Sequence, residues 1–350
     1  MGARRSVKCL EQIDPGSHRR VKGLRLVTAY AIAAMGGALV GGAQHAALCA
    51  LAGGFALWAS VSEGQTTRAA SSRDLLMLNA AAVLGAGMVV VLGPLLDVWF
   101  PRGGELTLVL GAFLVGYLKR FGTLGAGLGS QIYIGQLLAY GARPVADDLW
   151  TVVLAGMVAT GASIVPRLLS GPAEQPASAP IAAWPPVNQS EERARELRMG
   201  LQAALAALTI VLLNAAFDLR ESAWAVTACT YVIAGSTAGT MERVRRRIIG
   251  TMAGVPLGLA LTPIMAEAPL LAWLAAALAM VVYAVALPER YDIACGAYAF
   301  TLMVTLTVTG AGPVSLLAAR AWETVLGGVI GVAAALLVWP LGPARRTRTR

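Results

Sequence analysis

The sequence is poor in the residues that build metal and redox centres. It contains two histidines and four cysteines in 350 residues. Cys9, Cys49, Cys229 and Cys295 lie far apart, with no CxxC pair and no spacing typical of a disulfide framework. Two histidines are too few for a metal cluster. We therefore expect the cysteines to be small core residues.

The motifs of common catalytic sites are missing as well. The chain has no GxxxxGK[ST] phosphate loop, no HExxH pair and no GxSxG nucleophile motif. These absences exclude the usual ATPases, zinc hydrolases and serine hydrolases. We predict that the protein is not an enzyme, and that it uses no cofactor and no metal.

Charge is scarce, and long apolar runs take its place. Charged residues make up 13% of the chain and hydrophobic residues 57%, whereas a soluble domain is about 25% charged. A run of about twenty apolar residues can cross the hydrocarbon layer as a helix, and in lipid only helices or closed barrels satisfy every backbone group. The sequence therefore predicts an all-α polytopic protein whose first partner is the lipid bilayer.

Twelve candidate transmembrane spans alternate with short polar breaks. The first six cover residues 22–42, 45–63, 74–96, 105–118, 123–141 and 148–169. The second six cover residues 199–217, 222–237, 248–266, 268–287, 292–310 and 317–340.

Basic residues give the orientation of these spans. All but four of the 28 Lys and Arg residues fall in the N-terminal segment, the C-terminal tail and every second break. The four that do not are Arg102, Arg143, Arg220 and Arg320. Because basic loops stay on the cytoplasmic side, both termini are predicted to be cytoplasmic. The net charge of +9 then reflects anchoring, and we expect no nucleic-acid partner.

A proline-rich linker divides the chain into two halves. We predict a cytoplasmic N-terminal segment (1–20), a first six-helix half (21–170), a cytoplasmic linker (171–198), a second six-helix half (199–340) and a basic cytoplasmic tail (341–350). The halves are expected to be parallel repeats, because each has an even number of spans. Aligning them places Arg73 on Arg247.

The densest polar segment is the basic stretch 241–247, which contains Arg243, Arg246 and Arg247. It could anchor the chain on lipid headgroups or form an electropositive mouth that attracts anions, and both roles are compatible. Arg73 is expected at the matching place in the first half. Downstream, Gly250, Gly254 and Gly258 recur at every fourth position. This spacing favours close helix packing, with a broken, substrate-binding helix as the alternative.

Other polar residues fall inside the predicted spans. Arg320 and Glu323 share one helix face near the outer edge and could form an ion pair or act on a transport path. Glu63 is a second carboxylate in a span. Asn214, Tyr231 and Trp224 could bond to neighbouring helices or contact a polar or aromatic ligand.

Residues 191–340 resemble the fusaric-acid-resistance-like (FUSC) family of aromatic acid exporters. The resemblance rests on Ala223-Trp224-Ala225-Val226-Thr227, on the basic segment Glu242–Arg247 running into the spaced glycines, on Arg320-Ala321-Trp322-Glu323 and on the terminal Trp339-Pro340. It implies an integral membrane transporter that exports aromatic carboxylic acids or similar organic anions across a bacterial inner membrane, commonly with a periplasmic adaptor protein. It also suggests proton coupling, for which Glu63 and Glu323 are the candidate carriers.

The sequence thus predicts a secondary transporter of small organic anions with its site between the halves. Arg73, Arg243, Arg246 and Arg247 would attract the anion, and Arg320 with Glu323 would act near the exit. Two alternatives stay open: a passive organic-anion channel, which could be a homodimer, and a non-transporting membrane scaffold of a biosynthetic or efflux assembly.

Overall fold

The computed structural model of the chain describes residues 15–41, 45–64, 67–100, 102–142, 148–170, 189–219, 222–261, 263, 267–287, 289–308 and 314–341. The predicted N-terminal segment up to residue 14, the linker at 171–188 and the tail from 342 lie outside these ranges. Within them the chain is all-helical, and no strand occurs.

Each predicted span overlaps one α-helix of the structure. The first predicted half forms α2 (Pro15–Val40), α3 (His45–Ser62), α4 (Arg68–Trp99), α5 (Leu106–Tyr117), α6 (Gly122–Ala142) and α7 (Leu149–Leu169), with the short 3-10 helices η2 (Gly103–Glu105) and η3 (Leu118–Phe121). The second forms α8 (Gln189–Phe217), α9 (Ser222–Val232), α10 (Thr237–Ala260), α12 (Pro269–Ala286), α13 (Tyr291–Val308) and α14 (Val314–Leu337).

Several helices begin before their predicted spans, and α8 and α10 do so by about ten residues. α8 starts at Gln189, inside the predicted linker, and α10 starts at Thr237, so the basic segment 241–247 is helical rather than a loop. The side chain of Ser236 caps α10 by accepting a hydrogen bond from the Gly239 N–H. Glu242 then pairs with Arg246 one turn later, which stabilises a charged first half of the helix. A hydropathy pattern detects only apolar segments, so it could not predict that these helices begin with charged residues.

Five helical segments are long and apolar enough to cross a membrane: Arg20–Val40, Arg68–Trp99, Gly103–Ala142, Leu149–Leu169 and Arg193–Phe217. Shorter apolar helices cover Ala46–Ser62, Leu270–Ala286 and Ala321–Leu337. At a rise of about 1.5 Å per residue, α5 and α9 reach only about 18 and 16 Å, which is short of the hydrocarbon thickness. Twelve spans therefore stay a prediction.

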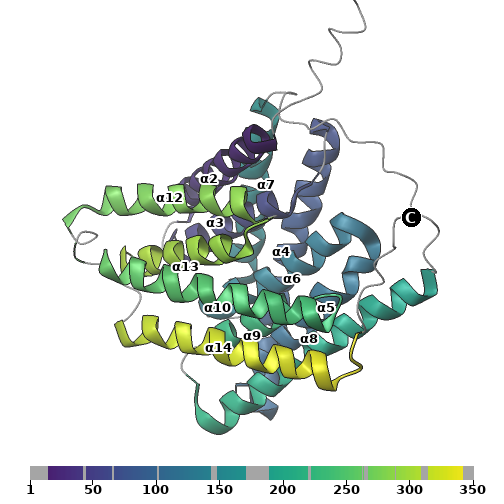
Figure 1. Cartoon of the computed structure of the whole chain (residues 1–350). Helices are drawn as coiled ribbons and strands as arrows, with labels where there is room; N and C mark the ends of the chain where they lie inside the picture. The colour runs from purple at the N-terminus through teal and green to yellow at the C-terminus, as the bar shows by residue number, and fades with distance from the viewer. Residues whose placement is uncertain are drawn as a thin grey trace, which may run out of the picture.

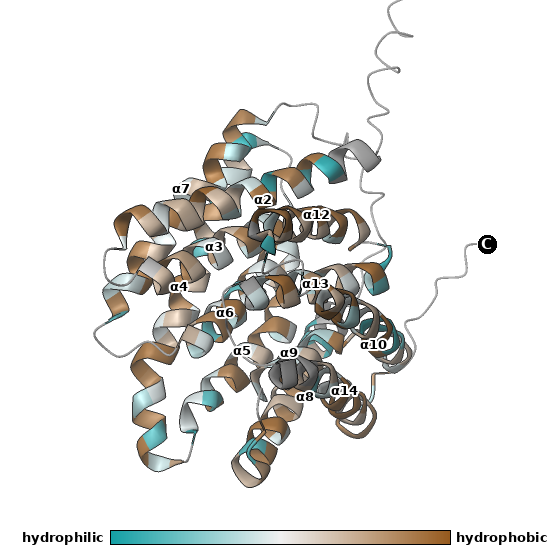
Figure 2. Ribbon diagram, turned by 90° about the vertical axis from the view of Figure 1, so that its left-hand side faces the viewer, coloured by the Kyte–Doolittle hydropathy of each residue, from teal (hydrophilic) through white to brown (hydrophobic). Residues whose placement is uncertain are grey.

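The outside of the helix bundle is apolar, as Figure 2 shows by the brown outward faces of several helices. Leu95 on α4, Leu270 and Leu278 on α12 and Leu337 on α14 are all more than half exposed. Apolar surface of this extent is disfavoured in water and is normal against lipid tails. The chain is a helical membrane protein.

Helices α12, α13, α10 and α14 lie side by side in that order, as the green and yellow ribbons of Figure 1 show. In the first half α6 packs on α4 and α5, and in the second α13 packs on α10 and α12. The halves meet where α2 packs on α12 and where α5 packs on α8. If α2–α7 are matched in order with α8–α14, each of these contacts in one half has its counterpart in the other. A duplicated fold would pack in this way. The duplication itself stays a prediction.

Glycines allow the closest of these contacts. A Cβ at Gly254 on α10 would overlap the carbonyl oxygen of Gly296 on α13, and a Cβ at Gly85 on α4 would overlap that of Ile132 on α6. α10 runs without a break through Gly250, Gly254 and Gly258. The packing interpretation of these glycines is therefore confirmed, and the broken-helix alternative is wrong.

Candidate functional site

A cavity of about 1480 Å³ lies between helices from both predicted halves. Its walls come from α3 and α6 of the first half and from α8, α9, α10, α12 and α13 of the second, with η2 at one end. Two hydrogen bonds join α6 to α9 beside it: Ser130 to Tyr231 at 2.7 Å and Tyr133 to Thr227 at 2.9 Å. The cavity therefore lies at the contact of the two halves.

One face of α10 forms the charged wall of the cavity. The lining residues Gly239, Glu242, Arg243, Arg246 and Arg247 recur at intervals of three or four residues, as residues on one helix face do. Because α10 begins at Thr237, Arg247 lies nearly three turns inside the helix rather than at its mouth. The helix thus carries a cation into the interior of the bundle.

Arg247 lines the cavity, and its guanidinium makes few hydrogen bonds to the described residues. Its Nη1 lies 3.5 Å from the hydroxyl of Tyr291 on α13. Its Nε is buried and has no hydrogen-bond partner among the residues that the structure describes. No carboxylate of this described part forms an ion pair with Arg247. A partly buried charge without a counter-charge is costly, so this position favours binding of an anion.

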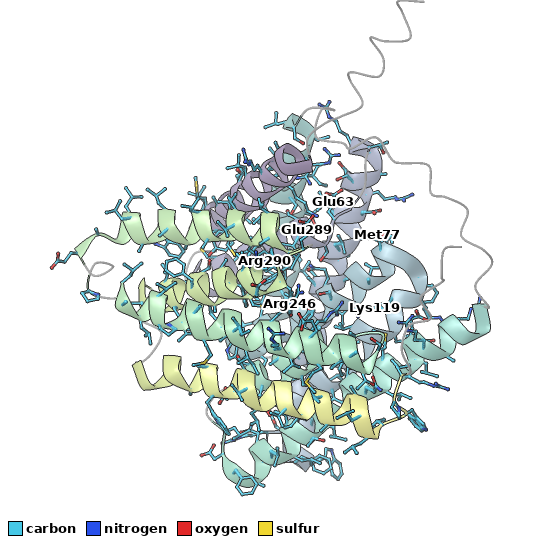
Figure 3. The ribbon with its side chains drawn as sticks, in the orientation of Figure 1. Glu63, Met77, Lys119, Arg246, Glu289 and Arg290 are labelled. Atoms are coloured by element: carbon cyan, nitrogen blue, oxygen red, sulfur yellow. The ribbon has the colours of Figure 1, made fainter. Side chains whose placement is uncertain are left out.

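Two further arginines mark the end of the cavity where α10 begins. Arg246 pairs with Glu242 at 2.6 Å and donates from Nη1 to the Glu289 carbonyl at 3.2 Å. Figure 3 shows Arg246 near Glu289 and Arg290 among the side chains between helices. Arg243 donates to the carbonyl of Ile233, at the end of α9. These side chains are half-exposed or exposed, so they can meet an anion at the edge of the cavity.

Aromatic side chains form a second wall, which we call the aromatic cluster: Trp58, Trp224, Tyr283 and Tyr298. Trp58 on α3 meets Tyr283 and Tyr298 edge to face, with ring centroids 5.9 and 5.4 Å apart. Trp224 lies 6.5 Å from Tyr298. Rings in such pairs are held in place and still offer faces and edges to a further ring. The cluster therefore suits an aromatic ligand.

A polar network lines the other end of the cavity. Glu105, which is only 1% exposed, accepts hydrogen bonds on Oε1 from Ser222 at 2.6 Å and Asn214 at 2.7 Å. Arg102 donates to Asn214 Oδ1 at 2.7 Å and pairs with Asp218. The hydrogen bond to Asp218 raises the pKa of Arg102, so its guanidinium stays charged. In the described part of the chain, no group of three or more His, Cys, Asp or Glu residues could hold a metal ion.

The structure brings six of the predicted site residues to the cavity. They are Asn214, Trp224, Tyr231, Arg243, Arg246 and Arg247. Their roles in transport stay predictions, but their common location agrees with a site between the halves.

Four other predicted residues are not placed in its lining. Arg73 is exposed and pairs with Asp74, so its alignment with Arg247 does not give it an equivalent position. Glu63 is buried against Arg25 at 2.8 Å and lies apart from Arg246 (Figure 3). Glu323 is buried in α14 outside the cavity lining. The side chain of Arg320 lies outside the described residues.

Sequence reasoning missed the polar end of the cavity and most of the aromatic wall. Arg102 and Asp218 looked like ordinary loop charges, and Glu105 like the edge of a span. Tyr283 on α12 and Tyr291 and Tyr298 on α13 are eight and seven positions apart, and this spacing gives no sign that they converge. The charge of Glu105 at the start of an apolar run was the one available signal.

Fold and cavity together define a helical membrane protein with an internal cavity that has both charged and aromatic walls. Residues 205–334 match the family model described as fusaric acid resistance protein-like. This range includes α9, α10, α12 and α13, which supply the charged wall and most of the aromatic wall. The match indicates membrane transport of the efflux type. No curated protein and no solved structure matches the chain.

Proposed function

We propose that this protein exports small organic anions, and aromatic carboxylates best of all, through the cavity between its halves. The observation that carries the proposal is Arg247, a cation inside the bundle that faces a cavity walled by the aromatic cluster. The carboxylate of the substrate would accept charge-assisted hydrogen bonds from the Arg247 guanidinium. The aromatic ring of the substrate would pack against Trp58, Trp224 or Tyr298. The match to the fusaric acid resistance protein-like family also supports export of an organic anion.

The proposed topology has both termini in the cytoplasm of a bacterial cell and the protein in the inner membrane. It places Arg243 and Arg246 at the cytoplasmic end of the cavity, where they raise the local concentration of anions. Glu105 and Arg102 then lie at the periplasmic end. A periplasmic adaptor protein would dock at that end, and the protein would act as a monomer or homodimer.

Transport of fusaric acid, a pyridine carboxylic acid, by the purified protein in liposomes tests this function. The measurement is made at pH 8, because the ionised acid crosses lipid slowly by itself. We expect saturable efflux that benzoate inhibits. Rapid flux that does not saturate would show a channel instead, and a folded protein without flux would favour the scaffold.

Replacing Trp58 by leucine should weaken selection for aromatic anions. A lost ring contact is worth about 1 kcal/mol, or about a fivefold change in affinity. We expect benzoate to inhibit fusaric acid transport about fivefold less well, while inhibition by butyrate changes little. Trp99→Leu is the matched control, because Trp99 is 79% exposed on the outer surface of α4. An equal loss for benzoate and butyrate would contradict a role in ring recognition.

A further inference from the structure

Glu105 and its partners connect the two predicted halves at one end of the cavity. Glu105 and Arg102 come from the segment between α4 and α5, whereas Asn214 and Asp218 end α8 and Ser222 begins α9. Four contacts cross between the halves: Glu105 with Asn214, Glu105 with Ser222, Arg102 with Asn214 and Arg102 with Asp218. We call these five residues the latch.

The latch lies about 16 Å from the arginine end of the cavity. α9 begins at Ser222 in the latch and ends at Val232, and the Ile233 carbonyl that follows accepts from Arg243. Eleven helical residues span about 16 Å. The latch therefore lies at the end of the cavity away from these arginines, where an anion released on that side would leave.

The backbone of the latch is held in an unusual conformation on both sides. Arg102 has a φ of 61° and Asp218 a φ of 53°, both in the left-handed region. This conformation is disfavoured for a residue with a Cβ, and it persists where surrounding contacts hold it. Here those contacts are the ion pair of Arg102 with Asp218 and the hydrogen bonds to Asn214. Loosening them lets both turns relax.

One carboxylate oxygen of Glu105 accepts no hydrogen bond from the described residues. Tyr140 on α6 also donates to Oε1 of Glu105, at 2.5 Å, so three donors converge on that oxygen. Oε2 is buried and has no hydrogen-bond partner among the described residues. Glu105 also lines the cavity. A buried acceptor that lacks a donor, beside a water-accessible space, is a place where a proton can bind.

We propose that Glu105 binds a proton on Oε2 from the water on the latch side, and that this opens the latch to the transported anion. The inference rests on the proposed function for the direction of transport. Hydrogen bonds to a charged acceptor are about twice as strong as neutral ones. Protonation thus weakens all three bonds to Oε1 together, and with them the contact between the halves.

The charges around Glu105 also favour exit of the anion when Glu105 is protonated. The titratable groups that face Glu105 are Asp97 on α4, which accepts from the Gly104 N–H, Arg102 in the turn, Tyr140 on α6 and Asp218 after α8. With Glu105 ionised, Arg102 is outnumbered by carboxylates, which repel a departing anion. A proton on Glu105 removes one of these negative charges from the exit path. The proton leaves Glu105 again when the carboxylate faces the other side, so one proton enters for each opening.

Glu105→Gln tests this inference in proteoliposomes, because glutamine keeps the shape and the accepting oxygen but cannot take up a proton. We expect exchange of labelled for unlabelled fusaric acid at equal pH to persist, and accumulation driven by a pH gradient to fall at least tenfold. Glu63→Gln, which removes a buried carboxylate outside the cavity lining, should keep the response to the gradient. A response that survives in Glu105→Gln, or that depends on a sodium gradient at constant pH, would overturn the inference.

A second measurement does not depend on transport. Hydrogen–deuterium exchange of segments 102–106 and 214–222 in wild-type protein, corrected for intrinsic rates, should rise severalfold from pH 8 to pH 5. In Glu105→Gln it should be raised already at pH 8. Equal protection at both pH values in the wild type would reject the latch, even if fusaric acid is transported. Absence of fusaric acid exchange in the wild type would reject the proposed function while this measurement still decides on the latch.

Discussion

Arg247→Gln is expected to lower fusaric acid transport by about 30-fold or more. Truncating one partner of a buried, hydrogen-bonded charge pair costs about 2–5 kcal/mol, and about 1.4 kcal/mol corresponds to a factor of ten. Since Arg247 has no carboxylate partner among the described residues, the lost pair would be the one with the substrate. The measurement is the initial rate of saturable efflux from liposomes at pH 8, with the apparent KM.

Arg245→Gln is the matched control, because Arg245 lies two residues away, is 72% exposed and is not in the cavity lining. Both changes remove one positive charge from the same helix, so a general effect of net charge would affect them equally. Arg247→Lys should give an intermediate rate, because a lysine keeps the charge but not the planar pair of donors. Normal transport by a folded Arg247→Gln protein would remove Arg247 from the proposed path.

Gly254→Leu is expected to give the largest loss of stability. The Cβ alone would overlap the Gly296 carbonyl oxygen and would lie 3.0 Å from the Ala299 Cβ. Neither atom belongs to a flexible side chain, so α10 and α13 must move apart along their contact. Overpacking of this kind costs about 1–3 kcal/mol, and we expect the upper end because backbone must move. It would also displace Arg247, which lies two turns earlier on α10.

Thermal unfolding in detergent, followed with a thiol-reactive dye, checks this expectation, because Cys229 and Cys295 are buried in the folded protein. We expect the melting temperature of Gly254→Leu to fall by several degrees. Gly161→Leu on α7 should change it little, since no atom lies within 4 Å of a Cβ built there. Equal melting temperatures for the two variants would mean that the contact of α10 with α13 is not as close as the structure has it.

The class of protein followed from the sequence alone. Apolar runs of helix-spanning length and scarce charge led to an all-α membrane protein, and each expected span overlaps a helix of the structure, although twelve membrane crossings stay a prediction. Spaced glycines on α10 were correctly taken as packing positions. The basic segment, Trp224 and the residues after it also carried the resemblance to the family that residues 205–334 match. These features are local, because hydropathy, helical period and motif spacing are properties of neighbouring residues.

The make-up of the site was decided by the tertiary structure. Glu105 and Ser222 are far apart in the chain, and so are Trp58 and Tyr298; only the packing of one half on the other brings each pair together. Packing also separated Arg73 from Arg247, which the alignment had made equivalent, because one points to the outside and the other into the cavity. A buried charge is defined by what surrounds it in space. That environment is assembled from several helices, and the order of residues along any one of them does not contain it.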